Sequence, residues 1–138
     1  MNCWAGLDPG RCKCGLVLVD IEQHCVRDGM VVPPDTVENI LRNWVKTADL
    51  KGIVLGDGTT SRRWLKALPE IAPLHPIDER GSTLQARQRY WELWPPRSWR
   101  RLIPLGLQTP PGELDAIAAL VLVEKHLGMR FTWNETPR

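Results

Sequence analysis

Residues 3–32 read CWAGLDPGRCKCGLVLVDIEQHCVRDGMVV, and this stretch decides the fold. Residues 3–7, 15–19 and 24–32 are apolar segments with the length and residue types of buried strands. The connections between them are short, and the second is the polar run at 20–23. Two short connections predict a three-stranded antiparallel meander.

After residue 32 the pattern changes from strand to helix. Asp35 and Glu38 have the spacing of a capping box, and the apolar residues that follow lie on one helical face: Val37, Ile40, Leu41, Trp44 and Val45. Residues 52–56 predict a short buried strand, which leads into a helix carrying Trp64, Leu65 and Leu68. Residues 73–77 predict a fifth strand. A helix between two strands predicts that they are parallel.

The last part of the chain predicts two more helices. Ser82 and Gln85 have the spacing of a second capping box, ahead of a helix that continues to Pro95. Residues 95–112 are proline-rich and predict a loop or an irregular arm. The final helix is expected from about Glu113 to Leu127, with Gly128 as its stop.

These elements predict an α/β protein with a five-stranded mixed sheet flanked by helices. Three antiparallel strands, a helix, and then two parallel strands with helices between them is the order of the ribonuclease H-like fold. The chain has 138 residues, so we expect one domain over residues 1–138. The apolar run at 114–123 is too short to span a bilayer, and the start of the chain resembles a strand rather than a signal peptide. We therefore expect a cytoplasmic protein with no membrane partner.

Asp115 lies in the first turn of the final helix, which is otherwise apolar on nearly every face. A carboxylate on such a helix is expected to be buried or nearly so. Burying an ionised carboxylate without a partner costs several kcal/mol, which implies a metal cation, an arginine or a protonated state. Asp8 at the end of the first strand and Glu79 just past the fifth strand are matching acids.

We expect Asp8 and Asp115 to converge if the final helix crosses the sheet near the first strand, with Glu79 approaching from the edge. Carboxylates held together repel one another, which raises their pKa values and requires a cation. Oxygen ligands favour Mg²⁺ or Mn²⁺ over zinc, and such ions promote the hydrolysis of phosphodiesters. The four cysteines near the start of the chain allow two interpretations. They are free thiols in buried strands, or Cys12, Cys14 and Cys25 form a zinc site with His24.

Three motifs support this interpretation: GLDPGRCKCG at residues 6–15, DERGST at 78–83 and DAIAA at 115–119. They resemble, in the same order and over nearly the whole chain, the motifs of the YqgF/RuvX family. This family comprises small bacterial ribonuclease H-like proteins described as Holliday junction resolvases and as nucleases that mature the 5′ end of pre-16S ribosomal RNA. The resemblance implies catalytic and metal-binding acids at Asp8, Glu79 and Asp115.

The chain departs from the family pattern at two places. Cys12 and Lys13 stand where the family usually has Lys-Arg, so one basic contact is missing or is supplied by Arg11. The fourth strand runs into GDGTT at residues 56–60 instead of a Gly-Leu-Pro turn, which places a carboxylate at the strand tip. Asp57 is therefore either a fourth metal ligand or an ordinary Asp-Gly turn residue.

Positive charge is concentrated between residues 80 and 101, which hold six arginines and one acid. This segment therefore carries a charge of +5, and the rest of the chain carries −3, for a net charge of +2. This distribution is typical of polyanion-binding proteins. We expect phosphate contacts from these arginines and from the first motif: Arg11, Lys13, Arg80, Arg87, Arg89, Arg97, Arg100 and Arg101. The interleaved Tyr90, Trp91, Trp94 and Trp99 form either a platform that stacks on bases or core and dimer contacts.

The sequence thus predicts a hydrolase, a metal-dependent nuclease of structured nucleic acid, with 5′-end processing of pre-16S ribosomal RNA as the leading role. A Holliday junction resolvase-like DNA endonuclease and a non-catalytic nucleic-acid-binding or ribosome-assembly module are the alternatives. A symmetric resolvase requires a homodimer, whereas an RNA-processing nuclease can act as a monomer. An actin-like ATPase is disfavoured because it needs two lobes.

Overall fold

The computed structural model describes residues 2–58, 61–95, 102 and 114–134. A five-stranded sheet consists of β1 (Cys3–Asp8), β2 (Cys14–Asp20), β3 (Cys25–Val32), β4 (Leu50–Asp57) and β5 (Leu74–Asp78), in the order β3-β2-β1-β4-β5. The first three strands are antiparallel, and β4 lies parallel to both β1 and β5. The predicted ribonuclease H-like mixed sheet is therefore confirmed.

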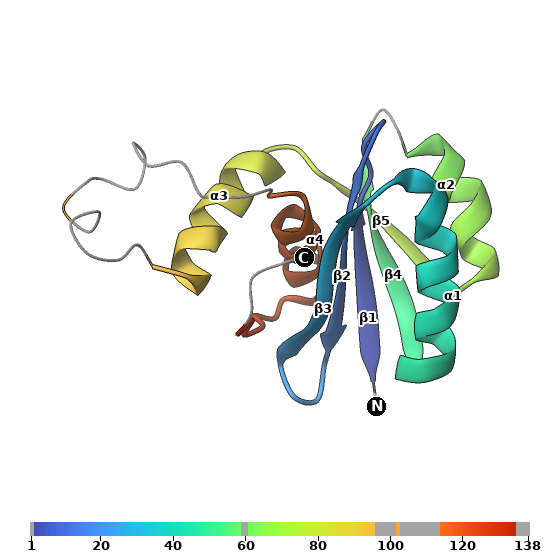
Figure 1. Ribbon diagram of the computed structural model, residues 1–138, viewed down its shortest axis with the longest axis horizontal. Helices are drawn as coiled ribbons and strands as arrows, with labels where there is room; N and C mark the ends of the chain where they lie inside the picture. Colours follow the sequence, from blue (N-terminus) through green and yellow to red (C-terminus); the bar gives the residue numbers. More distant parts are fainter. Residues whose placement is uncertain (1, 59–60, 96–101, 103–113, 135–138) are drawn as a thin grey trace.

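Helices cover both faces of this sheet (Figure 1). On one face lie η1 (Pro34–Thr36), α1 (Val37–Ala48), α2 (Arg62–Ala67) and η2 (Leu68–Glu70), and on the other α3 (Ser82–Leu93) and α4 (Asp115–Leu127). Each face has its own apolar core. Leu7, Leu41 and Leu55 belong to the α1 side, while Val17, Val54 and Leu120 belong to the α4 side.

The alternation of side chains along each strand decides which residues face α4. Leu7 and Leu55 pack on the α1 side, so their neighbours Gly6, Asp8 and Gly56 lie on the α4 side. The carboxyl ends of the parallel strands β1, β4 and β5 meet at one end of the sheet, the upper end in Figure 1. Side chains at this end and on this face are therefore neighbours.

Helix α4 lies very close to the sheet. All its residues from Ala116 to Val123 are buried, as expected for a helix that is apolar all round. A Cβ built on Gly6 would lie 2.6 Å from the Ala119 carbonyl oxygen, and one built on Gly15 would overlap the Asp115 carbonyl group. The absence of side chains at Gly6 and Gly15 thus allows the start of α4 to rest on β1 and β2.

Two helix starts differ from the sequence expectation. Helix α1 begins at Val37 after a 3₁₀ turn, and its N-cap Thr36 makes no side-chain cap hydrogen bond. Helix α3 begins at Ser82 after Gly81, whose φ of 77° is left-handed, so Gly81 and not Ser82 is the N-cap of this helix. Helix α4 ends as predicted at Gly128, with a φ of 64°. Within the described ranges, no helix combines the length and apolar character needed to cross a membrane.

Candidate active site

Two predicted catalytic acids meet at the carboxyl end of the sheet. Asp8 is the last residue of β1, and Glu79 directly follows β5. Strand β4 lies between β1 and β5, yet the Asp8 and Glu79 carboxyls lie within hydrogen-bonding reach of each other when one of them is protonated. The structure therefore brings together two of the three acids that the sequence selected.

The environment of Asp8 favours its protonated form. Burial contributes most, followed by the hydrogen bond to Glu79 and by the negative charges of Glu79 and Asp115, and together they raise the pKa of Asp8 to about 7. A carboxyl group whose pKa lies near neutrality exchanges its proton readily at physiological pH. The charges of Glu79 and Asp115 thus both act on Asp8.

Glu79 has an incompletely satisfied carboxylate. Its Oε2 atom is buried and has no hydrogen-bond partner among the described residues. A buried carboxylate oxygen without a donor is costly, and such an atom in a native structure indicates a missing proton, water or cation. The Glu79 carboxylate thus lies beside Asp8 with one oxygen that no donor among the described residues satisfies.

Asp115 is more exposed than the sequence predicted. It is the first residue of α4, its side chain is 34% exposed, and its Oδ2 lies 3.7 Å from Lys13 Nζ. The expectation of burial was wrong because the helix begins at Asp115 itself, so the carboxylate projects from the helix end instead of from its buried body. The helix N-terminus also stabilises a negative charge at this position.

Asp57 does not join the other acids. It follows Gly56 in β4 and so points to the α1 side of the sheet, away from Asp8. Its Oδ1 accepts a hydrogen bond from Ser61 Oγ at 3.0 Å, and Ser61 is the N-cap of α2. The geometry therefore favours the turn-residue interpretation of Asp57 over the fourth-ligand interpretation.

The zinc alternative is not supported. Cys14 begins β2 and pairs with Val32, whereas Cys25 of β3 pairs with Asp20 at the other end of β2, so the two cysteines are about 20 Å apart. Cys3 and Cys14 are buried strand thiols, and burial raises the pKa of both. Within the described part of the chain, no group of three His, Cys, Asp or Glu side chains is arranged to hold a metal ion.

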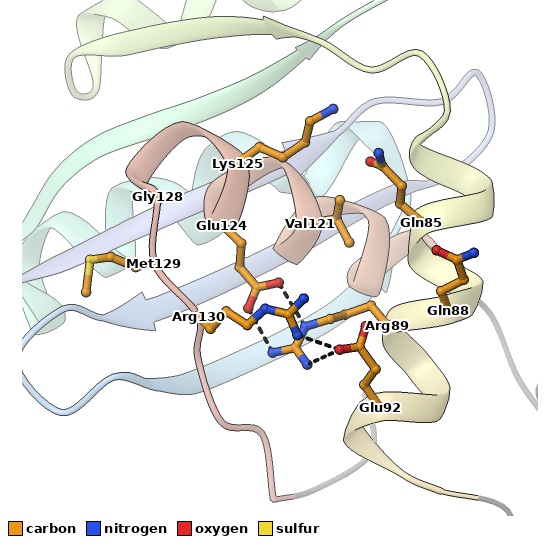
Figure 2. A pocket seen from close by; sticks show the side chains of 10 residues that line it. All are labelled: Gln85, Gln88, Arg89, Glu92, Val121, Glu124, Lys125, Gly128, Met129 and Arg130. Atoms are coloured by element: carbon orange, nitrogen blue, oxygen red, sulfur yellow. Dashed lines mark hydrogen bonds and ion pairs between the residues drawn. The ribbon is translucent and has the colours of Figure 1, made fainter.

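Arg89 is not available to a phosphate, contrary to prediction. Its guanidinium donates to both Glu124 carboxylate oxygens at 2.9 Å (Figure 2). It also donates to the Phe131 carbonyl oxygen at 2.9 Å, and its side chain is 10% exposed. With the neighbouring ion pair of Glu92 and Arg130, it lines a polar hollow of about 430 Å³ between α3 and α4. The buried Arg89–Glu124 pair joins α3 to α4, whereas the Glu92–Arg130 pair is exposed.

The other basic candidates differ in their surroundings. Arg11 and Lys13 are exposed on the loop beside Asp8, and Arg87 is half-buried on α3. Arg80 is exposed, and its Nε donates to Asp78 Oδ2 at 3.0 Å, one residue before Glu79. Arg97, Arg100 and Arg101 lie outside the described residues.

The aromatic residues of α3 belong to the core. Tyr90 and Trp91 are buried, and Trp94 packs against Tyr90 and Trp133 with ring centroids 5.1 and 5.5 Å apart. This arrangement favours the core interpretation over a base-stacking platform for Tyr90, Trp91 and Trp94. Trp99 lies outside the described residues.

Sequence reasoning missed the glycines that make room for Glu79. A Cβ on Gly56 would lie 2.5 Å from Glu79 Oε2, and a Cβ on Gly58 would overlap Glu79 Oε1. The signal was present, because these glycines have the even spacing of one strand face. Recognising it required the sheet order, which places β4 between the two acids.

Known structures share this fold. A Thermus thermophilus RuvC structure in complex with a Holliday junction substrate is 18% identical, with a TM-score of 0.56 over 91% of this chain and 92% of that chain. Another Thermus thermophilus RuvC structure is 13% identical, with a TM-score of 0.57 over 94% of this chain and 98% of that chain. No protein-family model and no curated protein matches the sequence. The likeness establishes the ribonuclease H-like fold.

Proposed function

We propose that this protein is a metal-dependent nuclease that hydrolyses phosphodiester bonds of structured nucleic acid. The observation that carries the proposal is the half-buried pair of Asp8 and Glu79 carboxyls, with Asp115 close enough for its negative charge to act on Asp8. The pair lies at the carboxyl ends of parallel strands, where open α/β sheets place their ligands. Repelling acids held in place by a fold lower its stability, so they are typical of a functional site.

The Asp8 and Glu79 pair has donor chemistry that fits a divalent cation, while in the described residues the two acids and Asp115 are not already arranged as a three-ligand site. The donors are carboxylate oxygens, which Mg²⁺ and Mn²⁺ prefer, and Glu79 Oε2 is buried without a hydrogen-bond partner among the described residues. Asp8 and Glu79 would hold the ion, and Asp115 would complete the set by exchanging its contact with Lys13. A bound ion of this kind supplies a Lewis acid that activates water and offsets the charge of the reacting phosphate.

The surrounding side chains provide binding and proton-transfer groups. Lys13 and Arg11 lie on the exposed loop after Asp8, where they can contact the phosphates that flank the bond to be cleaved. Asp8 has a pKa of about 7, so near neutral pH it is poised to lose its proton when a cation binds beside it. Arg80 and Arg87 extend the positive charge along the start of α3.

Two substrates are to be tested side by side. The resemblance to the YqgF/RuvX motifs favours 5′-extended pre-16S ribosomal RNA, and the fold shared with RuvC favours a four-way DNA junction. Wild type and Asp8→Asn are incubated with each substrate in Mg²⁺ or Mn²⁺, and both cleavage and binding are measured. We expect one substrate to be cleaved by the wild type and bound but not cleaved by Asp8→Asn.

A non-catalytic nucleic-acid-binding module is the second candidate. It is favoured by the contact of Lys13 with Asp115, which places a cationic side chain beside one of the three acids. Under this alternative, the wild type binds RNA or DNA but cleaves neither with either ion. Binding that is equal for wild type and Asp8→Asn, with no turnover, replaces the nuclease proposal with this one.

A further inference from the structure

Glu79 reaches Asp8 across an intervening strand. In the sheet order β1-β4-β5, neighbouring strands are about 4.8 Å apart, so the backbones of β1 and β5 are separated by about 10 Å. A glutamate and an aspartate can close that distance only by extending towards each other over β4. Any side chain on the α4 face of β4 at this level would stand in the way.

The end of β4 carries no such side chain. Asp57 pairs with Asp78, so Glu79, one residue further along β5, is level with Gly58. The three nearest heavy atoms to a Cβ built on Gly58 all belong to the Glu79 side chain, and the Oε1 atom would overlap it. A Cβ on Gly56 would lie 2.5 Å from Oε2 of the same carboxylate.

From this geometry we infer that Gly56 and Gly58 are positioning residues, which form a saddle over which the Glu79 carboxylate reaches Asp8. The inference rests on the proposed function, since it assigns these glycines to the same metal-binding pair. The saddle makes the length of the residue at position 79 important as well as its charge. It also explains why the end of this strand holds two glycines with a spacing of two residues.

Gly58 is the better position for a test because its substitution touches little else. Its φ lies outside the left-handed region, and the atoms it would displace are the far end of a flexible side chain. We therefore expect Gly58→Ala to fold with an unchanged melting temperature while its Glu79 carboxylate is pushed away from Asp8. Substitutions of groups that orient metal ligands weaken metal binding by about 10- to 100-fold.

The experiment measures Mn²⁺ affinity by electron paramagnetic resonance on the full chain, without nucleic acid. Wild type, Gly58→Ala, Glu79→Ala and the double variant are compared, with thermal unfolding in EDTA as the control for folding. We expect Gly58→Ala to weaken Mn²⁺ binding by about tenfold or more. In the Glu79→Ala background the same substitution is expected to have no further effect, because the carboxylate that it displaces is absent.

Glu79→Asp provides a second test that leaves the strand unchanged. It keeps the charge but shortens the side chain by one methylene, so the carboxylate should fall short of Asp8, and Mn²⁺ affinity should approach that of Glu79→Ala. The inference is overturned if Gly58→Ala and Glu79→Asp both bind Mn²⁺ as tightly as wild type while Glu79→Ala does not. It is also overturned if Gly58→Ala has the same effect with and without Glu79.

Failure of the proposed function has a different signature. In that case Mn²⁺ binding is undetectable in the wild type, or it is unchanged in Asp8→Asn and Glu79→Ala alike. The saddle would then have no metal-binding pair to position, and both proposals would be withdrawn.

Discussion

Replacing Asp8 by asparagine should stabilise the metal-free protein at alkaline pH. The wild-type protein must keep an ionised, partly buried Asp8 beside Glu79 and Asp115 once the pH exceeds its pKa of about 7. Asp8→Asn removes that charge and retains the size of the side chain. The cost of holding the site acids together is then relieved, as is common when active-site residues are substituted.

The size and pH range of this effect follow from the pKa of Asp8. A rise from the ordinary value of 3.8 to about 7 corresponds to about 4 kcal/mol, which is an upper limit because the site is in part open to solvent. A folded-state pKa above the unfolded value stabilises the protein fully below pH 3.8, and this contribution is lost as the pH rises through about 7. The advantage of Asp8→Asn should therefore be close to zero near pH 4 and reach its maximum above pH 8.

Urea unfolding in EDTA at a series of pH values between 4 and 9 measures this difference. Asp49→Asn is a matched control, because the exposed ion pair of Asp49 with Lys51 contributes little to stability, and asparagine tolerates the left-handed φ of 53° at this position. Its unfolding free energy should follow the wild type at every pH. A constant difference between Asp8→Asn and wild type across the pH range would refute the assigned repulsion.

Four further outcomes are expected. Mn²⁺ at about 100 times its dissociation constant should stabilise wild type by about 2.7 kcal/mol in thermal unfolding but leave Asp8→Asn unchanged. Equal stabilisation of both proteins would show that the ion binds away from Asp8. Arg89→Met should lower the free energy of unfolding in urea by about 3–5 kcal/mol, because it leaves Glu124 buried and unpaired, and Glu124→Leu added to it should recover part of the loss. Gly6→Ala should cost about 1–3 kcal/mol in the same assay, because its Cβ meets the backbone of α4; a neutral result would mean that α4 is not held close to the sheet. Asp57→Asn should leave Mn²⁺ affinity at the wild-type value, and a tenfold loss would restore Asp57 as a ligand.

The sequence predicted the parts of this structure that depend on local pattern. Strand periodicity and short connections gave the sheet, and the position of Asp8 at a strand end gave one half of the acid pair. The exposure of Asp115 was mispredicted because it depends on the residue at which α4 begins, which sequence patterns locate only to within a residue or two. Arg89 was misassigned because its partner Glu124 lies 35 residues away, and only tertiary packing brings them together.

The close approach of α4 to the sheet also determines where the acids of the site lie. Gly15, beside Asp8 in the β1–β2 register, lies under the first residue of α4, so a side chain there would push Asp115 away from Asp8. Gly58 plays the corresponding part on the other side, beneath Glu79. Each of the two more distant acids therefore approaches Asp8 over a glycine of a neighbouring strand. Since packing and acid geometry depend on the same backbone contacts, substitutions at Gly15 should affect stability and cation affinity together, whereas those at Gly58 should affect cation affinity alone.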